Sequence, residues 1–452
     1  MTSTAGIVYR SEMRWRAAAH ILLSPMTLAV MACSVSPHED RLRPIDAGNV
    51  SSQQPAREPS RPIELFSWWA RVGESDALEA LTHEHQRHHP GDVIIDATAE
   101  LSGLARSTLR QRMQRNEPPD TFQANAGRDL MQWVLFNGLD DHESKLLALD
   151  EVIDDVPNWR RNIPQAVLAP LSYGGKLYGV PSDIHRLNTI FYNRKVLRSY
   201  GLVEPRTVDD LRAMGRRLEG SGVSLLAIGS REPWTLALFA FESLLVAREG
   251  PAFYENYFRG RLKADDPHVL GAIRNMLDLL AFANDDHPQL TWLQAVDLVI
   301  RGKAAMTVMG DWARGYFAAK GLKVGQDFGE MAFPQSDATF VYTSDAFALP
   351  VLAKNRAGAE RLLRTIGSID GQRAVNEAKD ALSARMDVPP TDDPVLTRKF
   401  GLFKKGPLVL ALSGLVPARF ADDVAQALAE TVEQRDIEPT VETLRSRYVL
   451  LQ

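Results

Sequence analysis

The chain is poor in cysteine and has no block of basic residues. Cys33 is the only cysteine among 452 residues, which excludes an internal disulfide and any metal site built from cysteine ligands. The net charge is −5 without a lysine- or arginine-rich run, and phosphate binding needs clustered cations, so nucleic acid is not expected as a partner. We find no internal repeat, no phosphate-binding glycine loop and no Ser-His-Asp order.

The composition is that of a globular protein. Hydrophobic residues make up 45% and charged residues 24% of the chain, both ordinary values. The length allows two or three domains.

The N-terminal segment has the features of an export signal. Arg14 and Arg16 precede an apolar stretch, residues 17–32, which ends in Val-Met-Ala before Cys33. The stretch is too short and interrupted for a comfortable transmembrane helix. We predict a lipoprotein-type signal peptide over residues 1–33, starting at Met1 or Met13, with lipidation of Cys33 and attachment to a bacterial membrane. Ordinary secretion is the alternative.

Residues 34–60 are polar and rich in proline and serine. Such a segment cannot bury enough apolar surface to order itself. We predict a disordered tether between the lipid and the folded part.

From residue 62 onward, short apolar runs alternate with helical patterns. This βαβαβ rhythm predicts an α/β fold with a parallel sheet covered by helices on both faces. The expected strands are Ile63–Phe66, Val93–Ile95, Asp120–Gln123, Thr189–Tyr192, Leu225–Ile228, Ala304–Val308 and Val341–Thr343, and the expected helices are Ser75–His88, Thr108–Arg115, Thr207–Glu219 and Thr235–Glu249.

Two further features stand out in this pattern. The glycines of Tyr173–Pro181 indicate a hairpin, and the segment is expected to form a crossover between domains. Thr207 begins a helix with the outline of a capping box, with aspartate at the third helical position.

Trp68 and Trp69 lie just after the first expected strand. Ligands bind beyond the carboxyl ends of parallel strands, where Gln123 also lies. Indole faces at a cleft suit sugars, which have apolar C–H faces and polar rims. Because successive strand residues point to opposite faces, the alternative is that one indole is core and the other caps an edge.

Residues 302–317 predict a buried strand, a glycine turn and a helix. Asp311 is expected at or near the N-cap of this helix, where free N–H groups favour a carboxylate. Taken alone, Asp311 and Trp312 fit purely structural roles, in capping and packing, as well as they fit ligand binding.

Several motifs in order resemble the extracellular solute-binding proteins of bacterial ATP-binding-cassette sugar importers, the maltose-binding-protein-like group, and within it the glucose/mannose-binding branch. They extend from about Ile63 to Ala384 and include Trp68-Trp69 with Gly73-Glu74, Gly175-Lys176 leading to Val180-Pro181, Glu232-Pro233-Trp234, Gly302-Lys303-Ala304-Ala305-Met306, Gly310-Asp311-Trp312 and Thr343-Ser344-Asp345.

The resemblance implies a type II periplasmic-binding-protein fold, two α/β lobes joined by a hinge of about three crossovers. It implies a first lobe of residues 61–174 and about 340–387, and a second lobe of 175–339 and about 388–452. Sugar-binding residues carried over from the family pattern, with His185 and Asn188 added as cleft candidates beside the crossover, are Trp68, Trp69, Glu74, Gln123, His185, Asn188, Trp234, Asp311, Arg314 and Asp345.

The chain departs from that branch at two places that matter below. Arg314 stands where a lysine is usual, and arginine is a planar fork rather than a point charge. Lys379-Asp380-Ala381-Leu382 replaces a Lys-Gly-Ser pattern. These departures leave the identity of the sugar open.

Two other patterns give weaker evidence about function. His85 and His89, four residues apart among the histidines around Glu84, could indicate a metal, but we place them on the polar side of a helix and expect no metal and no cofactor. A glycoside hydrolase using Glu74 and Asp311 is an alternative to a binding protein.

The sequence therefore predicts a non-enzymatic, monomeric receptor at the periplasm or cell surface. It would capture a sugar, such as glucose or mannose, and deliver it to the transmembrane subunits of a permease by closing on the ligand. A sensor reporting to a signalling partner is a further alternative.

Overall fold

The computed structural model describes residues 61–71, 73–98, 102–135 and 144–452, which belong to a single unit, Arg57–Gln452. The predicted signal peptide, Cys33 and the tether lie outside the described residues. Within the described part of the chain, no helix combines the length and the apolar character that crossing a membrane requires.

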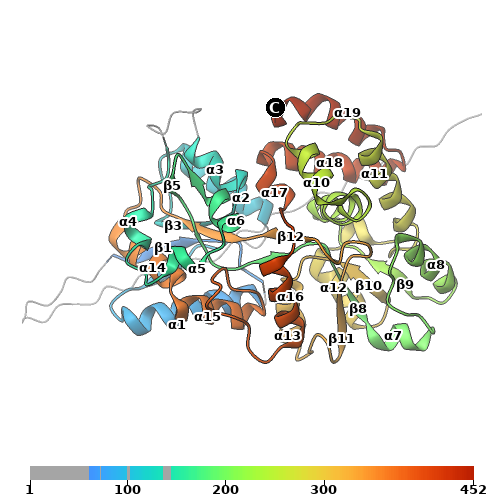
Figure 1. The fold of residues 1–452 in the computed structure, drawn as a ribbon, viewed down its shortest axis with the longest axis horizontal. Helices are drawn as coiled ribbons and strands as arrows, with labels where there is room; N and C mark the ends of the chain where they lie inside the picture. Colours follow the sequence, from blue (N-terminus) through green and yellow to red (C-terminus); the bar gives the residue numbers. More distant parts are fainter. Residues whose placement is uncertain (1–60, 72, 99–101, 136–143) are drawn as a thin grey trace, which may run out of the picture. The chain divides into compact units, whose positions relative to one another are not determined.

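The first sheet has five strands in the order β2-β1-β3-β13-β6 (Figure 1). β1 pairs in parallel with β2 and β3, as the βαβαβ rhythm predicts, whereas β13 runs antiparallel to β3 and β6. The sheet is therefore mixed: its βαβαβ part is parallel as predicted, and the antiparallel β13 was not predicted. Its strands are β1 (Ile63–Phe66), β2 (Ile94–Asp96), β3 (Thr121–Asn125), β6 (Val180–Pro181) and β13 (Asp345–Ala348).

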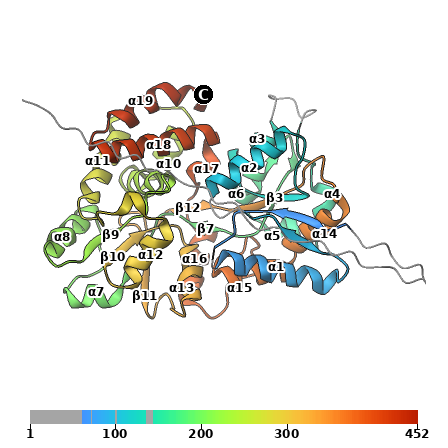
Figure 2. The same cartoon turned by 180° about the vertical axis from the view of Figure 1, so that it is seen from behind.

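Helices pack on this sheet through their apolar faces. Leu78 and Leu81, three residues apart on α1, are buried, and α1 lies beside α15 (Figure 2). We call this sheet and its helices the first lobe. The helices are α1 (Glu74–His88), α2 (Ser102–Gln114), α3 (Arg128–Val134), α4 (Asp150–Ile153), α5 (Trp159–Asn162), α6 (Gln165–Leu168), α14 (Arg356–Gly367) and α15 (Ile369–Lys379).

The second lobe is built on a four-stranded sheet in the order β11-β8-β10-β9. β10 is parallel to β9 and antiparallel to β8, and all five of its residues are buried. The strands are β8 (Thr189–Asn193), β9 (Ser224–Ala227), β10 (Ala304–Val308) and β11 (Phe328–Ala332).

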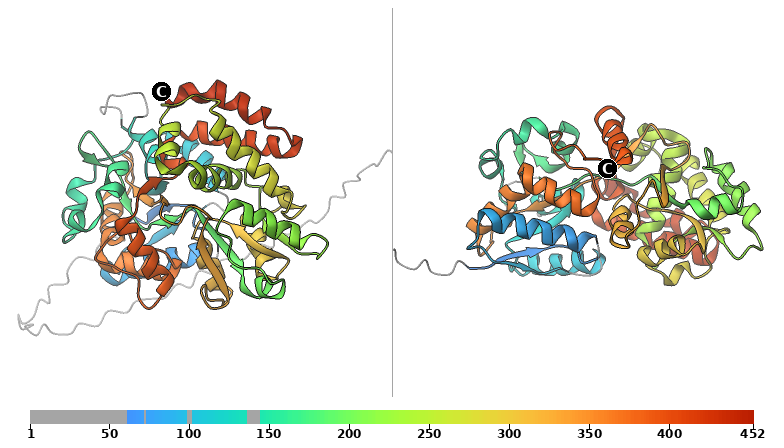
Figure 3. Two further views of the ribbon diagram at one scale, coloured as in Figure 1. Left: turned by 45° about the vertical axis from the view of Figure 1, so that its right-hand side comes forward. Right: turned by 90° about the horizontal axis from the view of Figure 1, so that it is seen from below.

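The helices of the second lobe surround a separate hydrophobic core, and the C-terminal helices, red in Figure 3, belong to it. The capping box of α8 is confirmed: Thr207 accepts from the Asp210 N–H at 3.1 Å, and the Asp210 carboxylate accepts from the Thr207 N–H at 2.8 Å. The helices are α7 (Arg194–Ser199), α8 (Val208–Leu218), α9 (Trp234–Ala237) continuing through a π-helical segment (Leu238–Leu245) into α10 (Val246–Phe258), α11 (Pro267–Leu280), α12 (Trp292–Ile300), α13 (Ala313–Ala319), α17 (Leu412–Leu415), α18 (Ala418–Gln434) and α19 (Glu438–Arg447).

Three segments of chain pass between the lobes, and one strand of each joins a common sheet, β14-β12-β7. These strands are β7 (His185–Arg186), β12 (Phe340–Thr343) and β14 (Leu408–Leu410), and α16 (Pro394–Lys405) precedes the last. β12 pairs with β7 antiparallel and with β14 in parallel. The hinge is thus a hydrogen-bonded element rather than three independent linkers.

The predicted glycine hairpin is present as β4 (Ser172–Tyr173) and β5 (Lys176–Leu177). Its turn residues, Gly174 and Gly175, have φ of 57° and 79°, which glycine adopts without strain. The hairpin does not itself cross between the lobes, because Leu177 and Ile184 pack in the first core. The chain crosses after Ile184. α16, assigned to the second lobe from the sequence, contributes apolar residues including Phe400 to the first core.

Candidate functional site

A cavity of about 190 Å³ lies between the lobes, with walls from both. The first lobe provides Trp68, Arg71, Glu74, Arg106, Asn125, Asp345 and Lys379; the second provides Glu232, Trp234, Ala237, Leu238, Glu242, Trp292, Trp312, Leu412, Ser413, Ala421, Asp422 and Ala425; the crossovers provide His185, Leu187 and Thr343. The lining therefore combines indole rings with charged groups of both signs.

Four indoles line the cavity: Trp68, Trp234, Trp292 and Trp312. Trp68 follows β1, and the guanidinium of Arg106 lies 5.1 Å from its ring centre. Trp234 and Trp312 have ring centres 5.9 Å apart, and the buried Nε1 of Trp234 has no hydrogen-bond partner among the described residues. An unpaired buried donor is costly, so this N–H is available to a ligand.

Trp69, the second member of the pair, is fully buried behind the cavity wall. Its Nε1 donates to Asp345 Oδ2 at 3.1 Å, and the ammonium of Lys379 lies 4.1 Å from its ring centre. Alternation along the chain thus sends Trp68 to the cavity and Trp69 to the core. Gln123 is likewise buried outside the lining, where its Oε1 accepts from the Trp68 N–H at 3.2 Å.

The carboxyl groups of Glu74 and Asp345 and the ammonium of Lys379 lie together in the cavity lining. Lys379 Nζ donates to Asp183 at 2.7 Å and to Asp345 at 2.8 Å. Burial raises the pKa of Glu74 to about 7, against the opposing charge of Lys379. Asp183, His185 and Asp345 converge as metal ligands would, but the Lys379 ammonium already pairs with both carboxylates.

His185 faces the cavity as a cation. Burial and Lys379 oppose its protonation, but Asp183 and Asp311 raise its pKa to about 9. Nδ1 lies 2.7 Å from Asp311, while Nε2 is 3.6 Å from Asp183 and has no partner within hydrogen-bond distance in the described chain. The imidazolium therefore has one N–H to offer a ligand.

Asp311 lies next to the cap residue of α13, near the N-cap as predicted, but its carboxylate does not cap the helix. The cap residue of α13 is Trp312, and the Asp311 carboxylate instead binds His185 and, at 2.7 Å, Lys399. It lies behind the cavity lining. This buried ion pair with Lys399 and the imidazolium keeps the pKa of Asp311 below its usual range despite burial.

Arg314 also lies outside the cavity lining, in a buried ionic cluster at the hinge. It donates to Glu330 at 2.6 Å, to Asp393 at 2.5 Å and to both oxygens of Asp380 at 3.0 and 3.3 Å. Lys399 joins Glu330 to Asp311, so buried charges continue from this cluster towards His185.

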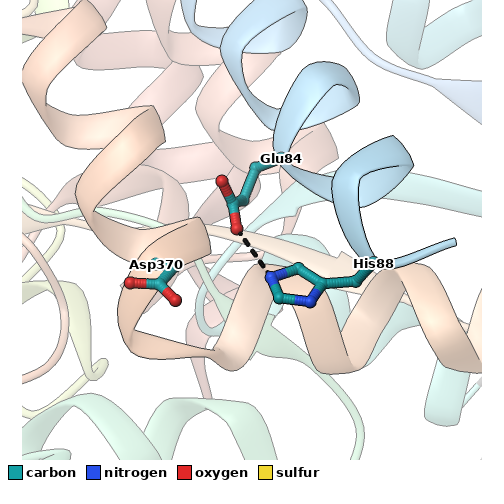
Figure 4. A group of neighbouring side chains, drawn as sticks. All are labelled: Glu84, His88 and Asp370. Carbon is teal, nitrogen blue, oxygen red and sulfur yellow. Dashed lines mark hydrogen bonds and ion pairs between the residues drawn. The ribbon is translucent and has the colours of Figure 1, made fainter. Parts of the chain in front are cut away.

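The histidines of α1 form two separate arrangements. Glu84, His88 and Asp370 converge at the surface between α1 and α15 (Figure 4), but the carboxylates of Glu84 and Asp370 are also paired with Arg87 and Arg373. These ion pairs account for the group without a metal.

The placement of His85 on a polar face is wrong. It is fully buried and bonds to Thr365 at 2.9 Å and Asp92 at 3.1 Å. It is a hydrogen-bonded core histidine.

Of the site residues predicted from the sequence, five line the cavity: Trp68, Glu74, His185, Trp234 and Asp345. Trp69, Gln123, Asn188, Asp311 and Arg314 do not; Asn188 is buried, bonded to Ser336 and Thr339. The lining residues Arg71, Arg106, Glu242 and Lys379 were not predicted as site residues. Arg71 lies next to a recognised motif and Lys379 lies within one, whereas Arg106 and Glu242 lie inside helices and give no local signal.

Comparison with known proteins agrees with this architecture. The family model for bacterial extracellular solute-binding proteins matches residues 73–373. An uncharacterized ABC transporter extracellular-binding protein of Pyrococcus horikoshii is 30% identical over 402 residues, covering 85% of this chain and 88% of its own. A probable sugar-binding periplasmic protein of Mesorhizobium japonicum is 28% identical, covering 74% and 78%.

Among solved structures, the bacterial solute receptor AcbH, described as preferring β-D-galactopyranose, superposes with a TM-score of 0.75 at 18% identity, covering 86% of this chain and 97% of its own. At that identity the match establishes the periplasmic-binding-protein fold. Together with the family match, it shows that this chain belongs to the bacterial extracellular solute-binding proteins, a family of non-catalytic receptors.

Proposed function

We propose that the protein is the sugar-binding component of an ABC importer, which captures a monosaccharide such as glucose or mannose between its lobes and delivers it to a membrane permease. The observation that carries this proposal is the mixed lining of the cavity. Trp68, Trp234 and Trp312 offer apolar ring surface, while charged groups from both lobes lie between them.

The polar groups match the chemistry of a polyol. A hydroxyl both donates and accepts, so it is best satisfied between a carboxyl and a cation. Glu74 and Asp345 supply acceptors, and His185 Nε2 and Trp234 Nε1 supply buried donors without protein partners in the described chain.

The size of the cavity favours one ring. A volume of about 190 Å³ corresponds to about six water molecules at roughly 30 Å³ each, which is room for one small ring rather than for an extended oligosaccharide. The names of the Pyrococcus and Mesorhizobium relatives support an ABC importer and a sugar.

Calorimetry and thermal unfolding with a panel of hexoses, pentoses and disaccharides test the proposal. We expect one monosaccharide to bind and to raise Tm. Trp68→Ala should weaken that binding by about 1–3 kcal/mol, because it removes a stacking surface. Absence of binding across the panel would refute a sugar receptor, and release of phenol from aryl glycosides would favour the hydrolase alternative.

We also propose that Cys33 is lipidated and holds the receptor at a bacterial membrane as a monomer. Expressed from its own start codon in a bacterial host, the protein should sediment with membranes, and Cys33→Ser should release it into the soluble exported fraction. If the wild-type protein and Cys33→Ser are released equally, the protein is secreted without a lipid anchor.

A further inference from the structure

An ion pair joins the two lobes at the edge of the cavity. Arg71 Nη2 lies 3.0 Å from Glu232 Oε1, and both residues line the cavity. Their side chains are only 14% and 11% exposed, so the pair is largely removed from water. Arg71 follows β1 in the first lobe, and Glu232 precedes α9 in the second.

A third residue fixes both partners. Glu232 Oε2 accepts from the backbone N–H of Trp292, the first residue of α12, at 3.2 Å. The Arg71 guanidinium also lies 5.5 Å from the centre of the Trp292 ring. The hydrogen bond and the ring contact of the Arg71 side chain are therefore both with the second lobe.

The backbone of Arg71 ties this contact to the ligand-facing start of α1. Its carbonyl accepts from the N–H groups of Glu74 and Ser75 at 2.8 and 2.7 Å. Movement of Arg71 away from Glu232 therefore moves the turn that carries Glu74.

We infer that Arg71 and Glu232 form a latch that holds the lobes closed over the ligand and sets how long it stays bound. The inference rests on the proposed function. Opening the cleft must separate the pair, whereas entry into an already open cleft does not. The latch therefore controls the dissociation rate far more than the association rate.

A double-mutant cycle tests the latch. Arg71→Gln and Glu232→Gln keep side-chain size and remove one charge each. We expect each to speed release of the bound sugar by about tenfold in stopped-flow tryptophan fluorescence, and the double variant to release it no faster than either single variant. Association rates should stay within about twofold.

Arg259→Gln is the matched control, because Arg259 pairs with Glu255 within α10, at the surface of one lobe. It should leave release unchanged. Unchanged release in Arg71→Gln, or fully additive effects of the two substitutions, would overturn the latch while leaving sugar binding intact.

If no sugar binds the wild-type protein, the proposed function fails. The latch is then tested on the ligand-free protein. Small-angle scattering should then give a larger radius of gyration for Arg71→Gln than for Arg259→Gln. Equal radii would overturn the latch.

Discussion

Glu242 is a carboxyl group buried within the second lobe. It is 5% exposed, and among the described residues the Leu412 N–H, 2.7 Å away, is the one hydrogen-bond donor to its carboxylate. Burial raises its pKa from 4.5 to about 7 against that single hydrogen bond. Between those two pH values the folded protein holds the proton more tightly than the unfolded chain.

This raised pKa predicts a pH-dependent gain from Glu242→Gln. The proton favours folding most fully below pH 4.5, and its contribution is lost as pH rises through 7. The amide can still accept from Leu412 and never ionises. We expect the stability of the variant relative to wild type to rise by about 2–3 kcal/mol between pH 5 and pH 8 in urea unfolding. An equal difference at both pH values would contradict this.

At the scale of elements, an ion pair links a helix of the first lobe to a helix of the second. Asp380 ends α15 in the left-handed conformation, with φ of 54°, which aspartate and asparagine tolerate better than most residues. Its carboxylate forms a forked pair with Arg314 of α13. The pair thus joins the end of a first-lobe helix to a second-lobe helix.

Two substitutions separate the charge from the backbone at this helix end. Asp380→Asn keeps tolerance of the left-handed conformation and should change stability by less than about 1 kcal/mol, because burial raises the pKa of Asp380 and so offsets the attraction to Arg314. Asp380→Ala loses the pair and also strains the backbone, adding about 1 kcal/mol. Urea unfolding midpoints measure both, and equal midpoints would show that the backbone conformation carries no cost.

Element order could be predicted from the sequence, because apolar runs and caps are local signals. β10 and the capped α8 lie where predicted, and α2 begins only six residues earlier. The antiparallel direction of β13 was not predictable, because it depends on a return from the other lobe. The location of Arg314 was missed for the same reason: its partner Asp380 is 66 residues away.

On the scale of the whole molecule, two glycines from different lobes lie in close contact, Gly73 of the first lobe and Gly315 of the second. A Cβ on Gly73 would lie 2.8 Å from the carbonyl carbon of Gly315 in α13, closer than packed atoms allow. Gly73 also has φ of 91°. The close approach of backbones on this side of the cavity therefore requires glycine.

Gly73→Ala should keep the lobes apart and weaken ligand binding by about tenfold or more in calorimetry. Gly175→Ala is the control, because it places a side chain at φ of 79°, closer to the 91° of Gly73, but its Cβ would meet nothing within 4 Å. That variant should lose stability and keep affinity within about twofold. Equal losses of affinity in the two variants would show that backbone strain, and not contact between the lobes, weakens ligand binding.

The chain passes between the lobes three times, so neither lobe is a continuous piece of chain. The three passages also bond to one another in one sheet. A fragment ending before residue 189 would lack β13, and thus the strand that joins β3 to β6. Truncation is therefore a poor route to an isolated half. A single protease cut in one passage should leave a nicked protein that still elutes as one species under native conditions.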